Sequence, residues 1–355
     1  MRRYLLPFCS FLLPLVALGQ GSLTPSGPPV PGMKRLDQVE PRTAVNTTTT
    51  PGNDTTHFVI NTAGSYYLTA NLSTNKPVGI LISSAGVTLD LNGFNVSGGT
   101  SGSGRGILIA SNGATVRNGS IRGWETGITT AQAAVTDGSY ERLLVSRCMS
   151  NGIVTGGNWL VDRCVATGND LAGIAGTAGT RVTNCIASGN GIGISLTSGG
   201  SVTDSTASGN KFHGIFGNGV TITGCTAEAN EQHGINVGTD SVVRDNKISG
   251  NGVDTTNAGA GVHVFGDRNR IIGNTISGND KGIFVTSRAN MIDGNNIRGA
   301  AGPGVEITMA NGKNIIIRNQ AGDNGGSYTA IAAGNNLAPV TAPESATNPY
   351  GNILN

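Results

Sequence analysis

Short runs of alternating apolar and polar residues recur along the chain with a period near twenty-one residues. The phrase Val-x-x-Cys-x-Ala-x-Gly-Asn is complete at 161–169 and again at 182–190. Looser copies occupy 202–210, 222–230, 243–251 and 271–279. Gly-Ile or Gly-Val pairs begin at Gly79, Gly106, Gly127, Gly152, Gly173, Gly193, Gly214, Gly234, Gly261, Gly282 and Gly304. Alternation of this kind predicts short β-strands separated by tight turns.

The length of the repeat decides how these strands assemble. A unit of two or three short strands cannot bury a core alone, so neighbouring units must stack. Helical repeats need about thirty residues or more with a 3.6-residue period, and the consensus leucines of leucine-rich repeats are missing. We therefore predict an all-β fold, a single-stranded parallel β-helix with about 20–22 residues per coil. We expect it to be right-handed, because parallel crossovers almost always are.

The first residues have the features of a secretory leader. Arg2 and Arg3 precede an apolar run, and Ala17-Leu18-Gly19 resembles a cleavage site, so we predict a signal peptide at 1–19. Export would bring the protein to the periplasm, the cell surface or the medium. The apolar run is too short to cross a membrane as a helix, and we predict no transmembrane span.

The rest of the chain divides into three parts. We expect residues 20–56 to form a Pro/Thr-rich linker and N-terminal segment. Residues 57–325 should form the parallel β-helix, with an N-terminal cap over its first coil, and 326–355 a C-terminal tail.

Charge is low and balanced, which excludes some partners. Charged residues make up 12% of the chain, and without Arg2 and Arg3 its basic and acidic residues are equal in number. Proteins that bind nucleic acid or anionic membranes concentrate positive charge. We therefore expect no nucleic acid partner and no binding to a membrane surface.

Two positions of the repeat carry small or amide side chains that would stack in columns. One position is assigned to Cys148, Cys164, Cys185, Ser205, Cys225, Asn246, Asn274 and Asn295. The other holds Asn169, Asn190, Asn210, Asn230, Asn251 and Asn279, where we expect left-handed backbone at a corner. Coils about 4.8 Å apart would let buried thiols and amides hydrogen-bond along the axis. Inert thiols are expected, with a Cys164–Cys185 disulfide as the alternative in an exported protein.

The recurring strand and turn residues of the repeats resemble those of the right-handed parallel β-helix repeat proteins of the pectin-lyase-like superfamily. The Gly-Ile/Val pairs and Ser-Gly-Asn corners carry this resemblance across 63–324. The segments MKRLDQVEPR at 33–42, GSYYL at 64–68 and NPYGN at 348–352 are similar to a group of exported bacterial β-helix proteins that has no agreed activity. The superfamily includes pectate lyases, polygalacturonases, alginate epimerases and carbohydrate-binding periplasmic proteins, so the resemblance implies the fold and suggests polysaccharide.

The catalytic signatures of these enzymes are largely missing. Polygalacturonases resemble one another in an Asn-x-Asp, an Asp-Asp pair and a Gly-His-Gly. Here only His213-Gly214 and His233-Gly234 resemble the last of these, and the sequence has no Asp-Asp pair. The acidic calcium cluster and arginine base that pectate lyases share are not found either.

The alternation of residues in the Gly-Ile strands predicts which side chains face solvent. The residue after each Ile or Val should face solvent, because alternate side chains point to opposite faces. These residues are Leu81, Leu108, Thr129, Val154, Ala175, Ser195, Phe216, Asn236, His263, Phe284 and Glu306. His213, His233 and Lys281 precede the glycines of the same C-terminal coils. Four rises of about 4.8 Å would make a strip about 19 Å long, enough for a few sugar units.

Three functions fit this strip, and binding of polysaccharide leads. Aromatic faces with polar neighbours suit sugars, so Phe216, Asn236, His263 and Phe284 are the predicted ligand-binding residues. The alternative is a lyase, C5-epimerase or glycoside hydrolase acting on uronate-containing polysaccharide. The second alternative is a structural or adhesion module, in which the exposed aromatics have no role.

The enzyme alternative assigns a role to four other residues of the strip. His213 or His233 would be the general acid or base, Lys281 would neutralise a uronate carboxylate, and Glu306 would transfer a second proton. We expect no metal and no cofactor, and calcium and copper are the metals that the sequence leaves as alternatives. The histidines His213, His233 and His263 could hold copper or zinc, but no Cys, Asp or Met ligand accompanies them.

Overall fold

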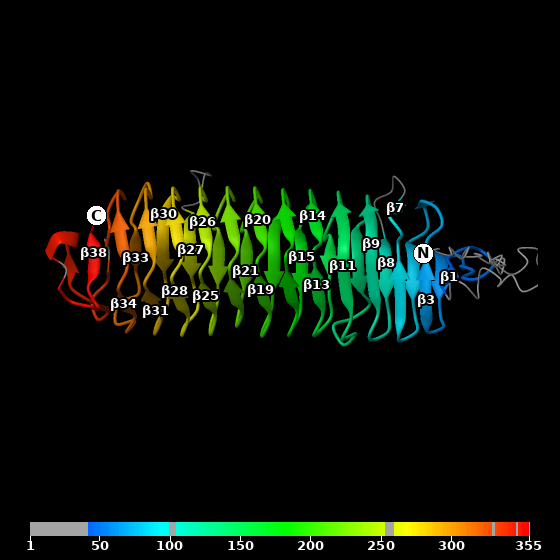
Figure 1. Ribbon diagram of the computed structural model, residues 1–355, viewed down its shortest axis with the longest axis horizontal. Coiled ribbons are helices and arrows are strands. Elements are labelled where there is room, and N and C mark those ends of the chain that lie inside the picture. Colours follow the sequence, from blue (N-terminus) through cyan, green and yellow to red (C-terminus); the bar gives the residue numbers. More distant parts are fainter. Residues whose placement is uncertain (1–41, 99–103, 253–258, 329–330, 346, 355) are drawn as a thin grey trace, which may run out of the picture. The chain divides into compact units, whose positions relative to one another are not determined.

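In the computed structural model, the strands of residues 42–354 lie side by side along one axis (Figure 1). The described residues are 42–98, 104–252, 259–328, 331–345 and 347–354. The predicted signal peptide and most of the predicted linker lie outside them. Strands of both sheets pair in parallel, and the described residues contain one 3-10 helix, Pro343–Ser345. The predicted all-β parallel β-helix is confirmed.

The first sheet receives one strand from each coil. Its twelve strands in the described residues are β2 (Thr56–Ile60), β5 (Val78–Ile82), β8 (Arg105–Ile109), β10 (Thr126–Thr130), β12 (Ile153–Val154), β15 (Ala172–Gly176), β18 (Ile192–Leu196), β21 (Ile215–Gly217), β24 (Ile235–Val237), β27 (Ala260–Val264), β30 (Lys281–Val285) and β33 (Val305–Ile307). They lie in chain order, so neighbours in the sheet are neighbours in the sequence of coils.

The second sheet receives two short strands from most coils, on either side of a bend, and has 26 strands in the described residues. The strands before the bend are β1 (Thr43–Ala44), β3 (Gly64–Tyr67), β6 (Val87–Asp90), β13 (Leu160–Asp162), β16 (Arg181–Thr183), β19 (Ser201–Thr203), β22 (Thr221–Thr223), β25 (Val242–Arg244), β28 (Arg270–Ile272), β31 (Met291–Asp293), β34 (Ile315–Ile317) and β36 (Asn336–Leu337). Those after it are β4 (Leu72–Thr74), β7 (Asn95–Gly98), β14 (Val165–Thr167), β17 (Ile186–Ser188), β20 (Thr206–Ser208), β23 (Thr226–Glu228), β26 (Lys247–Ser249), β29 (Thr275–Ser277), β32 (Asn296–Arg298), β35 (Gln320–Gly322) and β38 (Asn352–Leu354). The longer β9 (Thr115–Arg122) and β11 (Ser139–Ser146) run through both rows, and β37 (Val340–Thr341) pairs with β38.

A column of branched side chains forms the core behind the first sheet. Its members are paired in register from coil to coil and fully buried: Ile80, Ile107, Ile128, Ile153, Ile174, Ile194, Ile215, Ile235, Val262, Ile283 and Val305. Each such side chain contributes about 1.5–3 kcal/mol through burial. This column explains the Gly-Ile and Gly-Val pairs of the sequence.

The glycine of each pair is required by close packing. A Cβ added at Gly193 would lie 2.5 Å from the carbonyl oxygen of Gly214 and 2.8 Å from the side-chain amide of Asn210. Any side chain there would push the next coil away. Glycine is therefore required just before the buried Ile194, where the backbone packs against the next coil and its asparagine.

Asparagines stack at the corners of the coil and join one coil to the next. The Asn169 N–H and side-chain amide both donate to Asn190 Oδ1, at 3.0 and 2.8 Å, and Asn190 Nδ2 donates to the Ala166 carbonyl at 3.0 Å. The same pattern repeats in a second ladder that runs from Asn246 through Asn274 and Asn295 to Asn319 and Asn352. A third ladder, absent from the sequence prediction, comprises Asn269, Asn290, Asn314 and Asn335. Each buried amide is satisfied by its neighbours, as burial demands.

The assignment of Cys148 to the ladder of Cys164 is wrong. Strand β11 pairs with β14 so that Val145 aligns with Ala166, and the Cys148 N–H donates to Asn169 Oδ1 at 3.0 Å. Cys148 therefore begins the ladder that continues through Asn169. The residue of β11 that occupies the position before Cys164 is the buried Leu143.

The asparagines of the Asn169 ladder do not have the left-handed backbone that the sequence suggested. The residue before each one has positive φ instead: 64° at Gly168, 63° at Gly189 and 52° at Ala229. The bend inside the second sheet follows the same rule, with φ of 51° at Arg163, just before Cys164. The two roles belong to separate residues, because the asparagine amide must point inward while the residue before it, with positive φ, turns the chain.

Both ends of the β-helix extend beyond the expected limits. The segment where an N-terminal cap was expected, residues 57–72, is instead part of the β-helix, because β2 pairs with β5 and β3 pairs with β6. Before them, β1 pairs with β3, and Val45 is buried. At the other end, β36 and β38 of the expected tail pair with β34 and β35.

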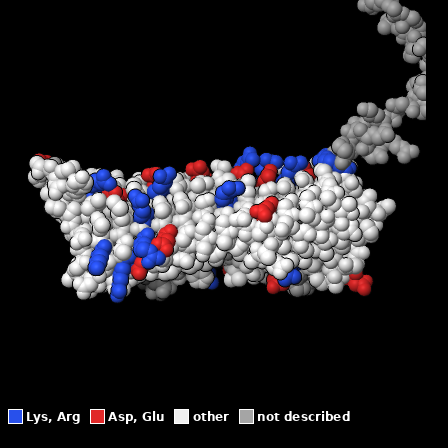
Figure 2. Space-filling model, turned by 90° about the horizontal axis from the view of Figure 1, so that it is seen from below, with Lys and Arg blue, Asp and Glu red and all other residues white. Residues whose placement is uncertain are grey.

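The surface carries few charges, and they are dispersed. Figure 2 shows one face on which most of the surface is uncharged and small groups of basic and acidic side chains alternate. Within the described part of the chain, no helix is long and apolar enough to span a membrane.

Four buried cysteines give the first testable prediction. Cys148, Cys164, Cys185 and Cys225 are free thiols, and desolvation raises the pKa of Cys148 and of Cys225 to about 11. We expect all four to react with a thiol reagent at least about 100-fold more slowly in the native protein than in denaturant, because all four side chains are buried and a reagent reaches them only after unfolding. Labelling followed by mass spectrometry checks this; fast native labelling of all four would contradict the inward ladders.

Candidate functional site

The eight residues that the sequence assigned to the strip lie together on the outer face of the first sheet. Phe216, Asn236, His263, Phe284 and Glu306 pair in register along β21, β24, β27, β30 and β33. His213 and His233 stand just before β21 and β24, and Lys281 opens β30. We call this surface the strip. Period-two alternation produces it, because the neighbours of each outward residue fill the core column.

Aromatic rings form a continuous row through the strip. His213 stacks on His233 with ring centroids 5.2 Å apart and 11° between planes, and lies 6.0 Å from Phe216. His233 lies 4.6 Å from His263, which in turn stacks on Phe284 at 5.1 Å. The row thus crosses four consecutive coils.

Phe265, which was not among the residues predicted from the sequence, widens the row. Its ring lies 5.9 Å from that of Phe216 and 6.0 Å from that of His263, and its side chain is exposed. Phe265 follows His263 by two residues, so it lies on the same face just beyond the end of β27. Extending the period of two past the strand would have found it.

The acceptor nitrogens of two imidazoles are already engaged. The Asn236 side-chain amide donates to His213 Nε2 at 3.0 Å, and the Ala260 N–H donates to His233 Nδ1 at 3.0 Å. The proton of neutral His233 is therefore on Nε2. His213 Nδ1, Asn236 Oδ1 and His263 Nδ1 are buried with no hydrogen-bond partner in the described residues. The strip thus keeps unused hydrogen-bonding capacity, which is rare for buried polar atoms.

The histidines are neutral at neutral pH. Burial lowers the pKa of His213 to about 4. Burial, followed by the charges of His263, His213 and Lys281, lowers the pKa of His233 to about 3. For His263, burial and then the charges of His213 and Lys281 lower the pKa to about 4. The imidazoles therefore act as polar aromatic rings rather than as cations.

Lys281 and Glu306 neutralise each other at the C-terminal end of the strip. Lys281 Nζ lies 2.8 Å from Glu306 Oε2, and both side chains are largely buried. The same ammonium lies 4.1 Å from the ring centroid of Phe284. The ion pair and the cation–π contact fix the orientation of Phe284 and leave this end without net charge.

The three histidines do not form a metal site. His213 and His233 stack with 11° between their ring planes, whereas the rings of His233 and His263 are tilted by 43°. Among the described residues no group of three or more His, Cys, Asp or Glu side chains is arranged to hold a metal ion.

Fold and strip together define a parallel β-solenoid with a row of aromatic rings on one exposed face. The sequence pattern of the right handed beta helix region matches residues 105–264 and 216–341, and the chain belongs to this family. No curated protein matches the sequence.

Solved structures share the fold at low sequence identity. The A-module of mannuronan C-5 epimerase AlgE6 from Azotobacter vinelandii has a TM-score of 0.57 at 16% identity, over 82% of this chain and 90% of that one. The AlgE4 A-module of the same organism has a TM-score of 0.54 at 15% identity, over 72% and 91%. A mutant tailspike protein of E. coli bacteriophage HK620, solved with a pentasaccharide, has a TM-score of 0.56 at 10% identity, over 84% and 67%. At these identities the likeness concerns the fold alone.

Proposed function

We propose that this protein binds polysaccharide through the strip, with sugar rings stacked on its aromatic row. The observation that carries the proposal is the unbroken contact of rings from Phe216 and His213 to Phe284. Sugars present apolar C–H faces and hydroxyl edges, which suit aromatic faces beside unused polar atoms. The epimerases and the pentasaccharide-bound tailspike that share the fold are carbohydrate-related, which is consistent with this proposal.

The geometry favours binding over the enzyme alternative. A general base needs a free lone pair, but those of His213 and His233 accept hydrogen bonds from Asn236 and Ala260. Their lowered pKa values make them weak bases at neutral pH. Lys281, which would neutralise a uronate, is paired with Glu306. The strip has no net charge, so we propose that its ligand presents mainly neutral sugar faces there.

The proposed place of action is outside the cytoplasm. The basic start, apolar run and small-residue site within 1–19 support export. Polysaccharides of cell surfaces and of the medium would then be available as ligands.

Removal of two aromatic rings tests the proposal. Phe216→Ala with Phe284→Ala should weaken glycan binding at least about tenfold, because each aromatic contact contributes about 0.5–1.5 kcal/mol. A glycan array with the purified chain selects the ligand, and calorimetry measures the affinity. Product analysis on the same polysaccharides separates a binding protein from an enzyme.

Two matched variants control for nonspecific effects. Val154→Ala and Leu108→Ala remove outward side chains at the same phase of the repeat on N-terminal coils, and should leave binding unchanged. Thermal unfolding must show that all variants remain folded. Unchanged affinity in the double phenylalanine variant would place the site elsewhere, and the absence of any glycan ligand would favour a structural module.

A further inference from the structure

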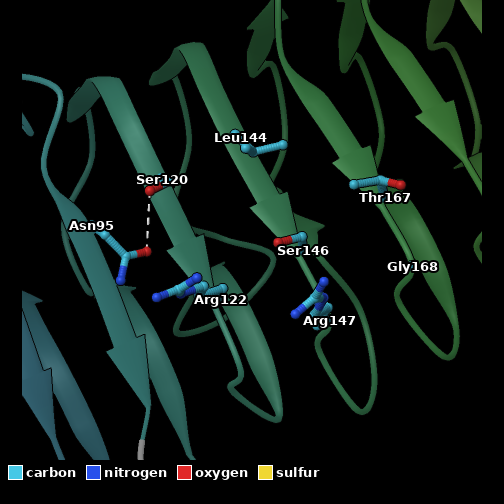
Figure 3. A pocket seen from close by; sticks show the side chains of 8 residues that line it. All are labelled: Asn95, Ser120, Arg122, Leu144, Ser146, Arg147, Thr167 and Gly168. Carbon is cyan, nitrogen blue, oxygen red and sulfur yellow. Dashed lines mark hydrogen bonds between the residues drawn. The ribbon is translucent and has the colours of Figure 1, made fainter.

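A second site candidate lies on the other sheet, far along the chain from the strip. Residues of β7, β9, β11 and β14, together with those that directly follow β11 and β14, border a shallow groove of about 450 Å³. Figure 3 shows Asn95, Leu144 and Thr167 around it, with Arg122 and Arg147 along one side. None of these residues belongs to the strip. We call this hollow the arginine groove.

The two arginines have no acidic partner in the part of the chain that the structure describes. Other arginines of the neighbouring coils do: Arg117 pairs with Asp90 at 3.2 Å, and Arg163 with Asp162 at 2.7 Å. None of the ion pairs of the described residues involves Arg122 or Arg147. Both side chains are exposed, so two positive charges face the groove without compensation.

Strand register accounts for the lack of a carboxylate next to Arg122 in its outward row of described residues. Arg122 pairs with Ser97 on one side and with Ser146 on the other, and Ser146 pairs with Thr167. This outward row continues through hydroxyl residues at 188 and 208 and reaches its first acidic residue only at Glu228. The groove is therefore bordered by hydroxyls and by cations.

The remaining lining suits a sugar. The Ser120 hydroxyl donates to Asn95 Oδ1 at 3.1 Å, which leaves the Asn95 amide hydrogens for a ligand. Leu144 is an exposed apolar residue at 43% of its full accessible area, and it stands across the groove from the arginines (Figure 3). A second hollow, bordered by Ser97 and Gly98, adjoins the same two arginines. An extended ligand could thus pass both arginines.

We propose that the arginine groove binds an acidic sugar unit, with the guanidinium groups of Arg122 and Arg147 paired to its carboxylate or sulfate. Guanidinium groups bind such oxyanions with two parallel hydrogen bonds, hydroxyl and amide groups bind sugar hydroxyls, and Leu144 contacts a C–H face. This site is independent of the strip proposed above, because it uses another sheet and other coils.

Binding to acidic polymers tests the proposal. The probes are a polyuronate oligomer, its carboxyl-reduced neutral form and a sulfated oligomer, each measured against the purified protein at low salt. The protein should bind the polyuronate or the sulfated oligomer at least about tenfold more tightly than the neutral form. Arg122→Gln with Arg147→Gln should abolish that preference. Which acidic oligomer shows the arginine-dependent preference identifies the oxyanion.

The control variant changes the net charge by the same amount, but at positions outside the groove. Arg181→Gln with Arg270→Gln removes two exposed arginines of β16 and β28 that form no ion pair with a described residue, and should leave the preference intact. Equal loss in both double variants, or retained preference in Arg122→Gln/Arg147→Gln, would overturn the proposal. Competition by inorganic sulfate without any preference among the oligomers would also overturn it. The Phe216→Ala/Phe284→Ala variant should keep the preference, so failure of one site is distinguishable from failure of the other.

Discussion

Replacement of Ile194 by proline should prevent the protein from folding to its native state. Ile194 is fully buried in β18, between Ile174 and Ile215 of the adjacent coils, and its N–H donates to the Gly214 carbonyl at 2.9 Å. Proline removes that donor from a strand paired on both sides and deletes most of a core side chain. The combined cost is about 4 kcal/mol or more, a large part of the stability of an ordinary domain.

The conservative variant separates the two contributions. Ile194→Val keeps the donor and most of the buried surface, and should cost only about 0.5–1.5 kcal/mol. Circular dichroism and denaturant unfolding of both variants measure the difference. Native-like unfolding of the proline variant would show that the first sheet is not continuous through β18.

Deletion of one coil should leave a shorter folded protein if the register is kept. Val182 aligns with Val202, so a coil here has 20 residues and the deletion that preserves register removes 182–201. Arg181 then takes the place of Ser201, while Ile174 would stack on Ile215 and Asn169 on Asn210. Interactions in a solenoid are mainly between neighbours, so the remaining coils should restack with little loss of stability.

A slightly longer deletion provides the sharpest control. Removal of 182–203 shifts the register by two residues and brings Asp204 to the inward position of Val182. An unpaired buried carboxylate costs several kcal/mol, and the asparagine ladder would be broken as well. We expect this variant to aggregate or to unfold more than about 10 °C below the register-preserving one in thermal scans. Equal stability of the two deletions would contradict the observed register.

Periodicity in the sequence was sufficient to predict the fold and the outward phase of the strip. A period of two allows one inward and one outward face, so Ile215 and Phe216 could be placed once a parallel solenoid was inferred. Cys148 could not be placed in the same way. Val161 and Cys164 have the same spacing as Ala166 and Asn169, because both halves of the second sheet place an inward residue three positions before a ladder residue. An isolated Val-x-x-Cys, such as 145–148, fits either half.

The hydrogen bonding and charge of the two candidate sites depend on contacts between coils, which the repeat pattern of the sequence does not indicate. The Ala260 N–H that engages His233 lies on the next coil, 27 residues along the chain. Within the described strands, the residues beside Arg122 are Ser97 and Ser146, and this depends on which strands of the second sheet are adjacent. Such contacts follow from the stacking of insertions and bends, which vary in length from coil to coil.

The ladders have a mechanical consequence. Their hydrogen bonds join each coil to the next, along the direction in which the coils stack. A force that pulls on one end of the chain would therefore detach coils one after another, because only the outermost ladder contacts carry the load. A coil of 20 residues releases about 66–72 Å of extended chain in exchange for about 4.8 Å of stack height. A molecule held at one end and bound to a polymer along its length would thus yield by stepwise elongation before its central coils are disturbed.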